Sequence, residues 1–137
     1  MIVVDSSVWI EFFHRPESPE KQAVDALIDR DRVALVGVVL AELLQGCRTP
    51  GEAEALLSNL AGLHFLETSF RSWRRTGELG SLLLRQGITI PLSDLIIAAL
   101  ALEHNCPVFT LDTHFRQIPG VKLYRPPRPT RPRGSRQ

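Results

Sequence analysis

The chain lacks the features of a membrane, secreted or zinc-binding protein. Its 137 residues include only two cysteines, Cys47 and Cys106, which are far apart and form no CxxC pair, so neither a disulfide framework nor a zinc site is expected. The longest run without a polar or charged side chain is residues 33–41, whereas a transmembrane helix needs roughly 20 apolar residues. Met1 leads within a few residues to Asp5, without the basic start of a secretory signal. We therefore expect a cytoplasmic protein in a reducing compartment.

Lysine is nearly absent, and the remaining positive charge is unevenly distributed. Residues 125–137 hold five of the sixteen basic residues and no acidic one, which leaves residues 1–124 with 11 basic and 15 acidic residues, a net charge of −4. The last segment is also rich in proline, so it is expected to be extended and to add nothing to a core. We predict one domain over residues 1–124 and a Pro/Arg-rich tail over residues 125–137. The tail either binds a polyanion such as RNA or is a solvated terminus.

Short apolar strands alternate with helices along the predicted domain. Strands are expected at residues 2–4, 33–36, 64–66, 107–111 and 121–124. Helices are expected at residues 6–14, from 19 onward, at 38–45, from 50 onward, at 70–86 with Trp73 and Leu83 inward, and at 94–104 with Ser93 as its cap. This alternation favours an α/β fold with three layers, in which helices cover both faces of a central, mostly parallel sheet. In such sheets, sites form at the carboxyl ends of the strands.

Four carboxylates lie in surroundings where a charge is unexpected. Asp5 follows the first expected strand and Asp112 follows the fourth, so parallel central strands would bring both to one edge of the sheet. Glu42 is the only charge within residues 38–44, which otherwise suggest a helix that is apolar all round. Asp94 opens an apolar run that predicts a buried helix. An ionised carboxylate is costly in such places unless it is paired or bound to a metal ion.

Each of these acids has a simpler interpretation, but the set favours a metal site. Asp5 and Asp94 could cap a helix or favour its dipole, and Asp112 could belong to a turn, whereas Glu42 fits neither role. No lysine or arginine lies near any of the four in the sequence. Hard oxygen ligands without cationic partners suit Mg²⁺ or Mn²⁺. Together the four acids predict a divalent cation site.

Four short motifs follow one another along the predicted domain. They are Asp5-Ser6-Ser7, Leu40-Ala41-Glu42-Leu43 with Gly46, Asp94-Leu95-Ile96-Ile97-Ala98-Ala99, and Thr110-Leu111-Asp112-Thr113-His114-Phe115. Together they span nearly all of residues 1–124, and their order and spacing resemble the PIN-domain family, most closely the VapC-type toxins of bacterial toxin–antitoxin pairs. The resemblance implies a PIN-like fold and a metal-dependent endoribonuclease that a partner antitoxin holds inactive.

The resemblance also implies roles for individual residues and partners. The catalytic and metal-binding acids would be Asp5, Glu42, Asp94 and Asp112, with Mg²⁺ as the cofactor and Mn²⁺ as the alternative. Ser6 and Thr110 match small hydroxyl positions that support the acids. RNA would be the substrate, a VapB-type antitoxin the partner and a homodimer the assembly, with no membrane involved. The chain departs from the pattern at His114, where relatives often carry another acid, and in its Pro/Arg-rich tail.

Other polar and aromatic residues carry weaker signals. Arg71, Arg74 and Arg75 share one face of a predicted helix and either contact RNA phosphates or form a solvated face. The four histidines show no metal-ligand spacing and are expected to be structural or surface residues. Tryptophan and phenylalanine are expected in the core or at a partner surface. Leucine and valine on the helices at 38–45 and from 50 onward suggest additional apolar surface.

Three rival functions differ from the ribonuclease in features that can be checked. A receiver-like signalling domain needs paired acids after its first strand and a lysine ending its last strand, and a haloacid-dehalogenase-type phosphatase needs Asp-x-Asp; residues 5–7 supply neither set of acids. The remaining alternative is a catalytically inactive PIN-like module that binds RNA or protein. Titration with Mg²⁺ or Mn²⁺ separates it from the enzyme, because the inactive module would bind neither ion.

Overall fold

The fold is built on a parallel sheet, as expected from the alternation of strands and helices. The computed structural model describes residues 1–127, so the predicted tail lies largely outside the described residues. The strands are β1 (Ile2–Val4), β2 (Val33–Val36), β3 (His64–Leu66) and β4 (Val108–Phe109), in the order β3-β2-β1-β4. All three pairings are parallel. Because β1 lies between β2 and β4, the residues that follow these three strands meet at one edge of the sheet.

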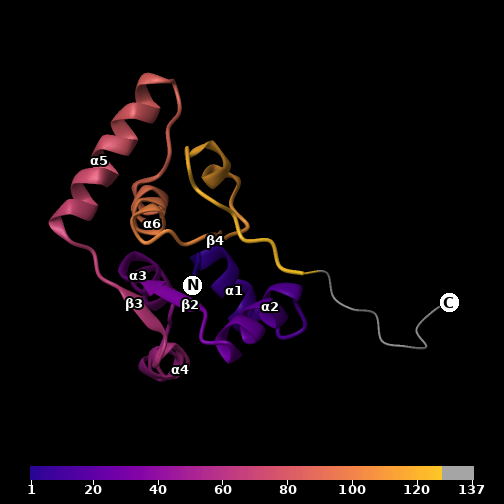
Figure 1. Ribbon diagram of the computed structural model, residues 1–137. Helices are drawn as coiled ribbons and strands as arrows, with labels where there is room; N and C mark the ends of the chain where they lie inside the picture. Colours follow the sequence, from indigo (N-terminus) through magenta and orange to yellow (C-terminus); the bar gives the residue numbers. More distant parts are fainter. Residues whose placement is uncertain (128–137) are drawn as a thin grey trace.

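Helices cover the two faces of this sheet. They are α1 (Ser6–His14), α2 (Pro19–Asp29), α3 (Gly37–Gln45), α4 (Pro50–Leu60), α5 (Phe70–Arg85) and α6 (Leu92–Glu103), followed by the 3₁₀ helix η1 (Thr113–Gln117). Figure 1 shows α1 and α2 on one side of the sheet and α6 on the other, with α5 packed against the outside of α6. The expected three-layer α/β/α architecture is confirmed. None of the helices in residues 1–127 is both long and apolar enough to span a bilayer.

Local sequence signals account for most element boundaries. The Ser18 hydroxyl accepts from the Lys21 amide at 3.1 Å and starts α2, where Pro19 occupies the first turn. The Thr49 hydroxyl accepts from the Glu52 amide at 3.1 Å and starts α4 in the same way. The α6 sequence is apolar on every side, and its residues 94–101 are all buried. This buried helix fixes the position of the acid in its first turn.

Three elements differ from the expectation. The strand expected at 107–111 ends at Phe109, because the next residues bond to side chains rather than to a neighbouring strand. The strand expected at 121–124 is reduced to a single parallel bridge between Leu123 and Val108. Helix α6 begins at Leu92, after Pro91, so Ser93 lies inside the helix rather than capping it.

Trp73 points outward, contrary to the prediction that it packs inward. It is half exposed, whereas Ser72, Thr76 and Leu83 form the buried face of α5. The two small polar residues let α5 approach α6 closely, and Gly80 continues this close contact, since a Cβ there would lie 3.0 Å from the Leu95 side chain. The inward face of α5 is therefore defined by small residues rather than by its largest aromatic residue.

Candidate active site

Asp5 lies at the carboxyl end of β1 and is almost fully buried, with 3% of its surface exposed. Two hydroxyl groups donate to the same carboxylate oxygen, Oδ2: Ser7 Oγ at 2.9 Å and Thr110 Oγ1 at 2.8 Å. Asp5 is also the N-cap of α1, but its side chain bonds to these hydroxyls rather than to the helix amides. The simpler interpretation of Asp5 as a helix cap is therefore wrong. The two hydroxyls stabilise a buried carboxylate without a cationic partner.

The same hydroxyls tie the ends of β1 and β4 together. Ser7 Oγ accepts from the Leu111 amide at 3.0 Å, and Thr110 Oγ1 accepts from the Asp112 amide at 2.9 Å. Ser6, the predicted supporting hydroxyl, makes a longer contact of 3.5 Å with Asp5 Oδ1. Ser7, which was not predicted for this role, is therefore the serine that holds Asp5. The Asp-Ser-Ser motif is visible in the sequence, but the helical turn that directs the second serine back to Asp5 is not.

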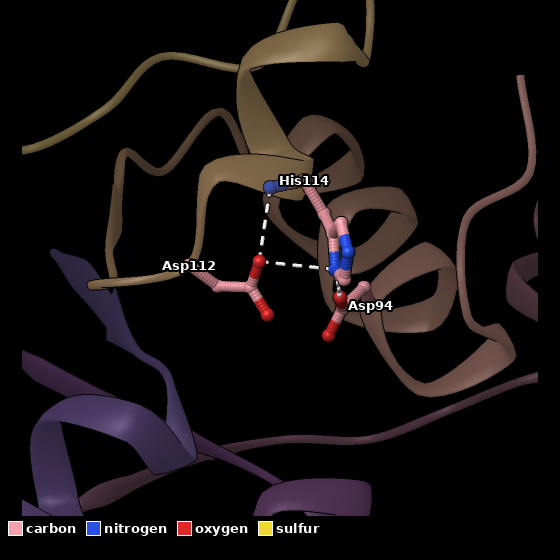
Figure 2. Close-up of side chains that lie close together, drawn as sticks. All are labelled: Asp94, Asp112 and His114. Atoms are coloured by element: carbon pink, nitrogen blue, oxygen red, sulfur yellow. Dashed lines mark hydrogen bonds and ion pairs between the residues drawn. The ribbon is translucent and has the colours of Figure 1, made fainter.

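Asp94, Asp112 and His114 form a compact cluster (Figure 2). Asp5 and Glu42 are close enough to interact electrostatically with Asp94, and we call the region around these five residues, at the carboxyl edge of the sheet, the crevice. Asp94 comes from the first turn of α6 and is 8% exposed, and Asp112 caps η1 by accepting from the His114 amide at 2.9 Å. His114 Nδ1 lies 2.9 Å from Asp94 Oδ2 and 3.0 Å from Asp112 Oδ1. One ligand atom from each of the three residues lies within 4.8 Å of the others. His114, which was expected to be a structural or surface residue like the other histidines, thus contacts both acids of this cluster.

Glu42 lies on the exposed side of α3, so the prediction of a helix that is apolar all round is wrong. Val39 and Leu43 are buried on the other side, whereas Ala41 is exposed beside Glu42. The expected burial failed because one face of α3 meets the sheet and the other meets solvent. The carboxyl group is nevertheless partly shielded from water. This shielding raises the pKa of Glu42, the charge of Asp5 raises it further, the Ser6 hydroxyl lowers it, and the charge of Asp94 raises it.

The acids influence one another electrostatically across the crevice. Burial raises the pKa of Asp94; the hydrogen bond from His114 opposes that rise, and the charges of Asp112 and Asp5 add to it. The bond to Asp94 raises the pKa of His114, burial works against it, and the charge of Asp112 adds to the rise. Within residues 1–127, no lysine or arginine forms a salt bridge with any of the four predicted acids. Four carboxylates thus share one crevice with a single imidazole.

This donor set fits a divalent cation. Carboxylate oxygens are the ligands that Mg²⁺ and Mn²⁺ take up in proteins, at bond lengths of about 2.1 Å for Mg²⁺. Asp94, Asp112 and His114 each offer one ligand atom, and these atoms lie close enough together to bind one ion. Asp5 Oδ1 has only the long Ser6 contact among the described hydrogen bonds. The burial of Asp5 and Asp94, the crowding of the carboxylates and their oxygen donors all fit a bound divalent cation.

A groove of about 680 Å³ adjoins the crevice between α1, α3 and α4. Its walls are largely apolar, with Ile10, Phe13, Leu43 and Leu56 among the lining residues, and Glu42 also lines it. Ile10 is half exposed although it is aliphatic. The groove therefore offers an apolar surface that continues to one of the four acids.

The three arginines of the predicted RNA-binding face lie on α5, away from the sheet (Figure 1). Arg71, Arg74 and Arg75 are all exposed. Arg74 Nε pairs with Glu78 Oε1 at 3.3 Å, one helical turn further along. Their contact with RNA stays a prediction, because the described contacts do not connect these arginines to the acidic crevice.

Comparison with known proteins agrees with this architecture. Ribonuclease VapC11 from Mycobacterium tuberculosis and a VapC ribonuclease from Mycobacterium bovis are each 27% identical to the chain over 124 residues, which is 86% of this chain and 91% of theirs. The structure of VapBC2 from Rickettsia felis bound to promoter DNA matches with a TM-score of 0.78 and 24% identity, covering 90% of this chain and 98% of that chain. VapC20 from M. tuberculosis, a toxin that cleaves the sarcin–ricin loop, matches with a TM-score of 0.67 and 17% identity, covering 92% and 100%.

The two structural matches, at these identities, establish the fold alone. The profile of the PIN domain family, however, matches residues 2–121. That range begins in β1 and extends past η1, so it includes every element of the sheet and every acid of the crevice. The chain belongs to the PIN domain family.

Proposed function

We propose that this protein is a divalent-metal-dependent endoribonuclease that cleaves RNA phosphodiester bonds, and that it is the toxin of a type II toxin–antitoxin pair. The observation that carries the proposal is the convergence of Asp5, Glu42, Asp94 and Asp112, from four separate segments, on one crevice at the carboxyl edge of the sheet. The VapC relatives, which are named as ribonucleases, support the reaction class.

The four acids would hold the cation. Mg²⁺ is the ion that the family resemblance implies, with Mn²⁺ as the alternative; when bound, such an ion lowers the pKa of water and stabilises charge that develops on a phosphate. The crevice would otherwise repel the RNA backbone, since its carboxylates lie in a domain whose net charge is −4 over residues 1–124. RNA binding at this edge of the sheet therefore depends on the same acids that hold the ion.

The surrounding side chains orient the acids. Ser7 and Thr110 both hold Asp5 Oδ2, which leaves Oδ1 as the less engaged oxygen of that carboxylate. His114 Nδ1 lies within hydrogen-bonding distance of both Asp94 and Asp112, so the imidazole holds these two carboxylates close together. Preorganised acids need no rearrangement when substrate binds, which lowers the free energy of the transition state relative to that of the bound substrate.

Replacement of one acid by its amide tests this proposal. Asp5→Asn keeps the shape of the side chain and an oxygen that can accept hydrogen bonds, but removes the charge. We expect RNA cleavage in Mg²⁺ or Mn²⁺ to fall by about three orders of magnitude while the circular dichroism spectrum stays unchanged. The exposed residue Asp29 supplies the matched control, Asp29→Asn, which should cleave normally. Full activity of Asp5→Asn, read from the sequenced ends of the RNA fragments, would exclude the proposed site.

The wild-type chain provides the test of the alternative, a catalytically inactive binding module. Under the proposal, the purified protein binds Mg²⁺ or Mn²⁺ in a calorimeter and cleaves RNA. Retention of RNA or protein binding without either property would favour the module. This comparison needs no variant, so it is independent of any effect of substitution on folding.

We also propose that a VapB-type antitoxin occupies the apolar groove beside Glu42 and that the toxin forms a homodimer. The matched structures include VapBC assemblies, and the groove joins an apolar surface to the acidic crevice. Ile10→Arg should abolish co-purification with the cognate antitoxin, because it places a charge on the half-exposed wall of the groove. Leu84→Arg, at an exposed leucine on α5, should not. Light scattering of the purified toxin measures the dimer directly.

A further inference from the structure

His114 divides the crevice into two chemically different halves. Asp5 and Glu42 contribute only oxygen, whereas the half formed by Asp94 and Asp112 includes an imidazole nitrogen at 2.9 Å from one carboxylate and 3.0 Å from the other. Figure 2 shows this ring nitrogen, Nδ1, directed at both acids. The nitrogen therefore lies among the candidate metal ligands.

The backbone holds His114 in this position. The Asp112 carboxylate accepts from the His114 amide at 2.9 Å, which fixes the first turn of η1. The next residue, Phe115, is 1% exposed and anchors the turn in the core, and Ile118 anchors the end of it with 3% exposure. Since the residues on both sides of the imidazole are held, its position is a property of the fold rather than of a mobile loop.

A nitrogen donor changes which cation a site prefers. Mg²⁺ takes oxygen ligands almost exclusively and retains several waters. First-row transition cations bind imidazole well, and their affinity for mixed nitrogen and oxygen sites rises along the series from Mn²⁺ to Cu²⁺. An imidazole in place of a carboxylate also removes one negative charge from the site, and Mg²⁺ depends most on that charge. Both effects favour a transition cation.

We propose that His114 is a metal-ligating residue that makes this crevice prefer a first-row transition cation such as Mn²⁺ to Mg²⁺. The inference rests on the metal-dependent function proposed above, and it deepens that function by assigning a determinant of ion specificity. It concerns one side chain, so it can be tested on the full-length protein without RNA.

Electron paramagnetic resonance of the Mn²⁺-loaded protein tests ligation directly. Electron spin echo modulation from ¹⁴N should be present in the wild type and lost in His114→Gln. His104 supplies the matched control, since its side chain is 41% exposed, as is that of His114, but it lies at the end of α6 beside Glu103. His104→Gln should keep the modulation. Absence of ¹⁴N modulation in the wild type, or its survival in His114→Gln, would overturn the assignment.

Competition between the two ions tests the preference. Mg²⁺ is titrated into the Mn²⁺-loaded protein, and released Mn²⁺ is measured from its six-line signal in solution. His114→Asp restores an all-oxygen set and should lower the ratio of Mg²⁺ to Mn²⁺ needed for half release by at least about tenfold. Because His114→Asp adds a carboxylate beside two others, thermal unfolding in Mn²⁺ checks that it is folded; the Gln variant tests ligation without that added charge.

The outcomes separate this inference from the function on which it rests. An unchanged ratio in folded His114→Asp would overturn the ion preference while RNA cleavage by the wild type still supports the nuclease. Failure of the wild type to bind either ion would overturn both the inference and the metal-dependent function. A lowered ratio together with loss of ¹⁴N modulation in His114→Gln would support the inference.

Discussion

Asp5 and Asp94 are both buried aspartates of one crevice, but the protein stabilises them differently. Two hydroxyls hold Asp5, whereas an imidazole holds Asp94. Hydroxyls keep the same hydrogen-bonding capacity across the physiological pH range, but an imidazole gains or loses a charge near neutrality. The Asp5 side is therefore a fixed anchor that joins two strands, whereas the Asp94 side is expected to respond to pH.

The largest effect is expected from removal of the hydroxyl that joins the two strands. Thr110→Val leaves the buried Asp5 carboxylate with the Ser7 hydroxyl as its one remaining close donor and leaves the Asp112 amide without the Thr110 acceptor, so we expect the free energy of unfolding to fall by about 1–3 kcal/mol. RNA cleavage should fall by about 10- to 100-fold. Thr76→Val is the matched control, because the hydroxyl of that buried threonine bonds only to the backbone of its own helix. If urea unfolding shows that both substitutions lower the free energy of unfolding equally, Thr110 does not anchor β1 to β4.

The next effect distinguishes the two serines beside Asp5. Ser7→Ala removes a 2.9 Å bond to Asp5 and the acceptor of the Leu111 amide, and should lower the free energy of unfolding by about 1 kcal/mol. Ser6→Ala removes a 3.5 Å contact with Asp5 and the hydroxyl that lowers the pKa of the exposed Glu42, and should cost less than about 0.5 kcal/mol. Urea unfolding of both variants measures the difference. A larger loss of unfolding free energy for Ser6→Ala would show that Ser6, as the family resemblance implied, is the main support of Asp5.

The smallest effect is a pH dependence confined to the Asp94 side. The pKa of His114 is raised above its ordinary value of 6.5, first by its bond to Asp94. Its contribution to stability is therefore fully present below pH 6.5 and is lost as the pH rises through the higher pKa of the folded state. Urea unfolding in the presence of a chelator should show this decline in the wild type and a flatter profile in His114→Gln. Identical profiles would show that the imidazole does not couple to folding.

The sequence was sufficient to predict the elements whose signals are local. The buried strand at residues 33–36 and the helix started by Ser18 and Pro19 were predicted from apolar runs and caps, and the parallel sheet was predicted from their alternation. The carboxyl edge of the sheet was also predicted as the place where Asp5 and Asp112 approach each other.

The remaining features depend on which way a side chain turns after the chain folds. Ser7 was missed because a helical turn directs it back to Asp5, and His114 was missed because a 3₁₀ turn directs its ring to Asp112 and Asp94 together. The exposure of Glu42 was missed because a nine-residue helix with one polar face looks apolar when only its composition is counted. Trp73 was misplaced because the helix contact is made by small residues. Each of these errors concerns orientation rather than the presence of an element.

The path of the chain after η1 has a practical consequence for experiments. Leu123 pairs in parallel with β4, so the polypeptide leaves the sheet at the same edge as Thr110 and Asp112, and Arg125 and Pro126 line a hollow together with Thr110. Met1, in contrast, precedes β1 at the opposite edge. A fluorescent label attached at Arg125 would therefore lie close to Thr110 at the carboxyl edge of the sheet, whereas one attached at Met1 would lie at the opposite edge.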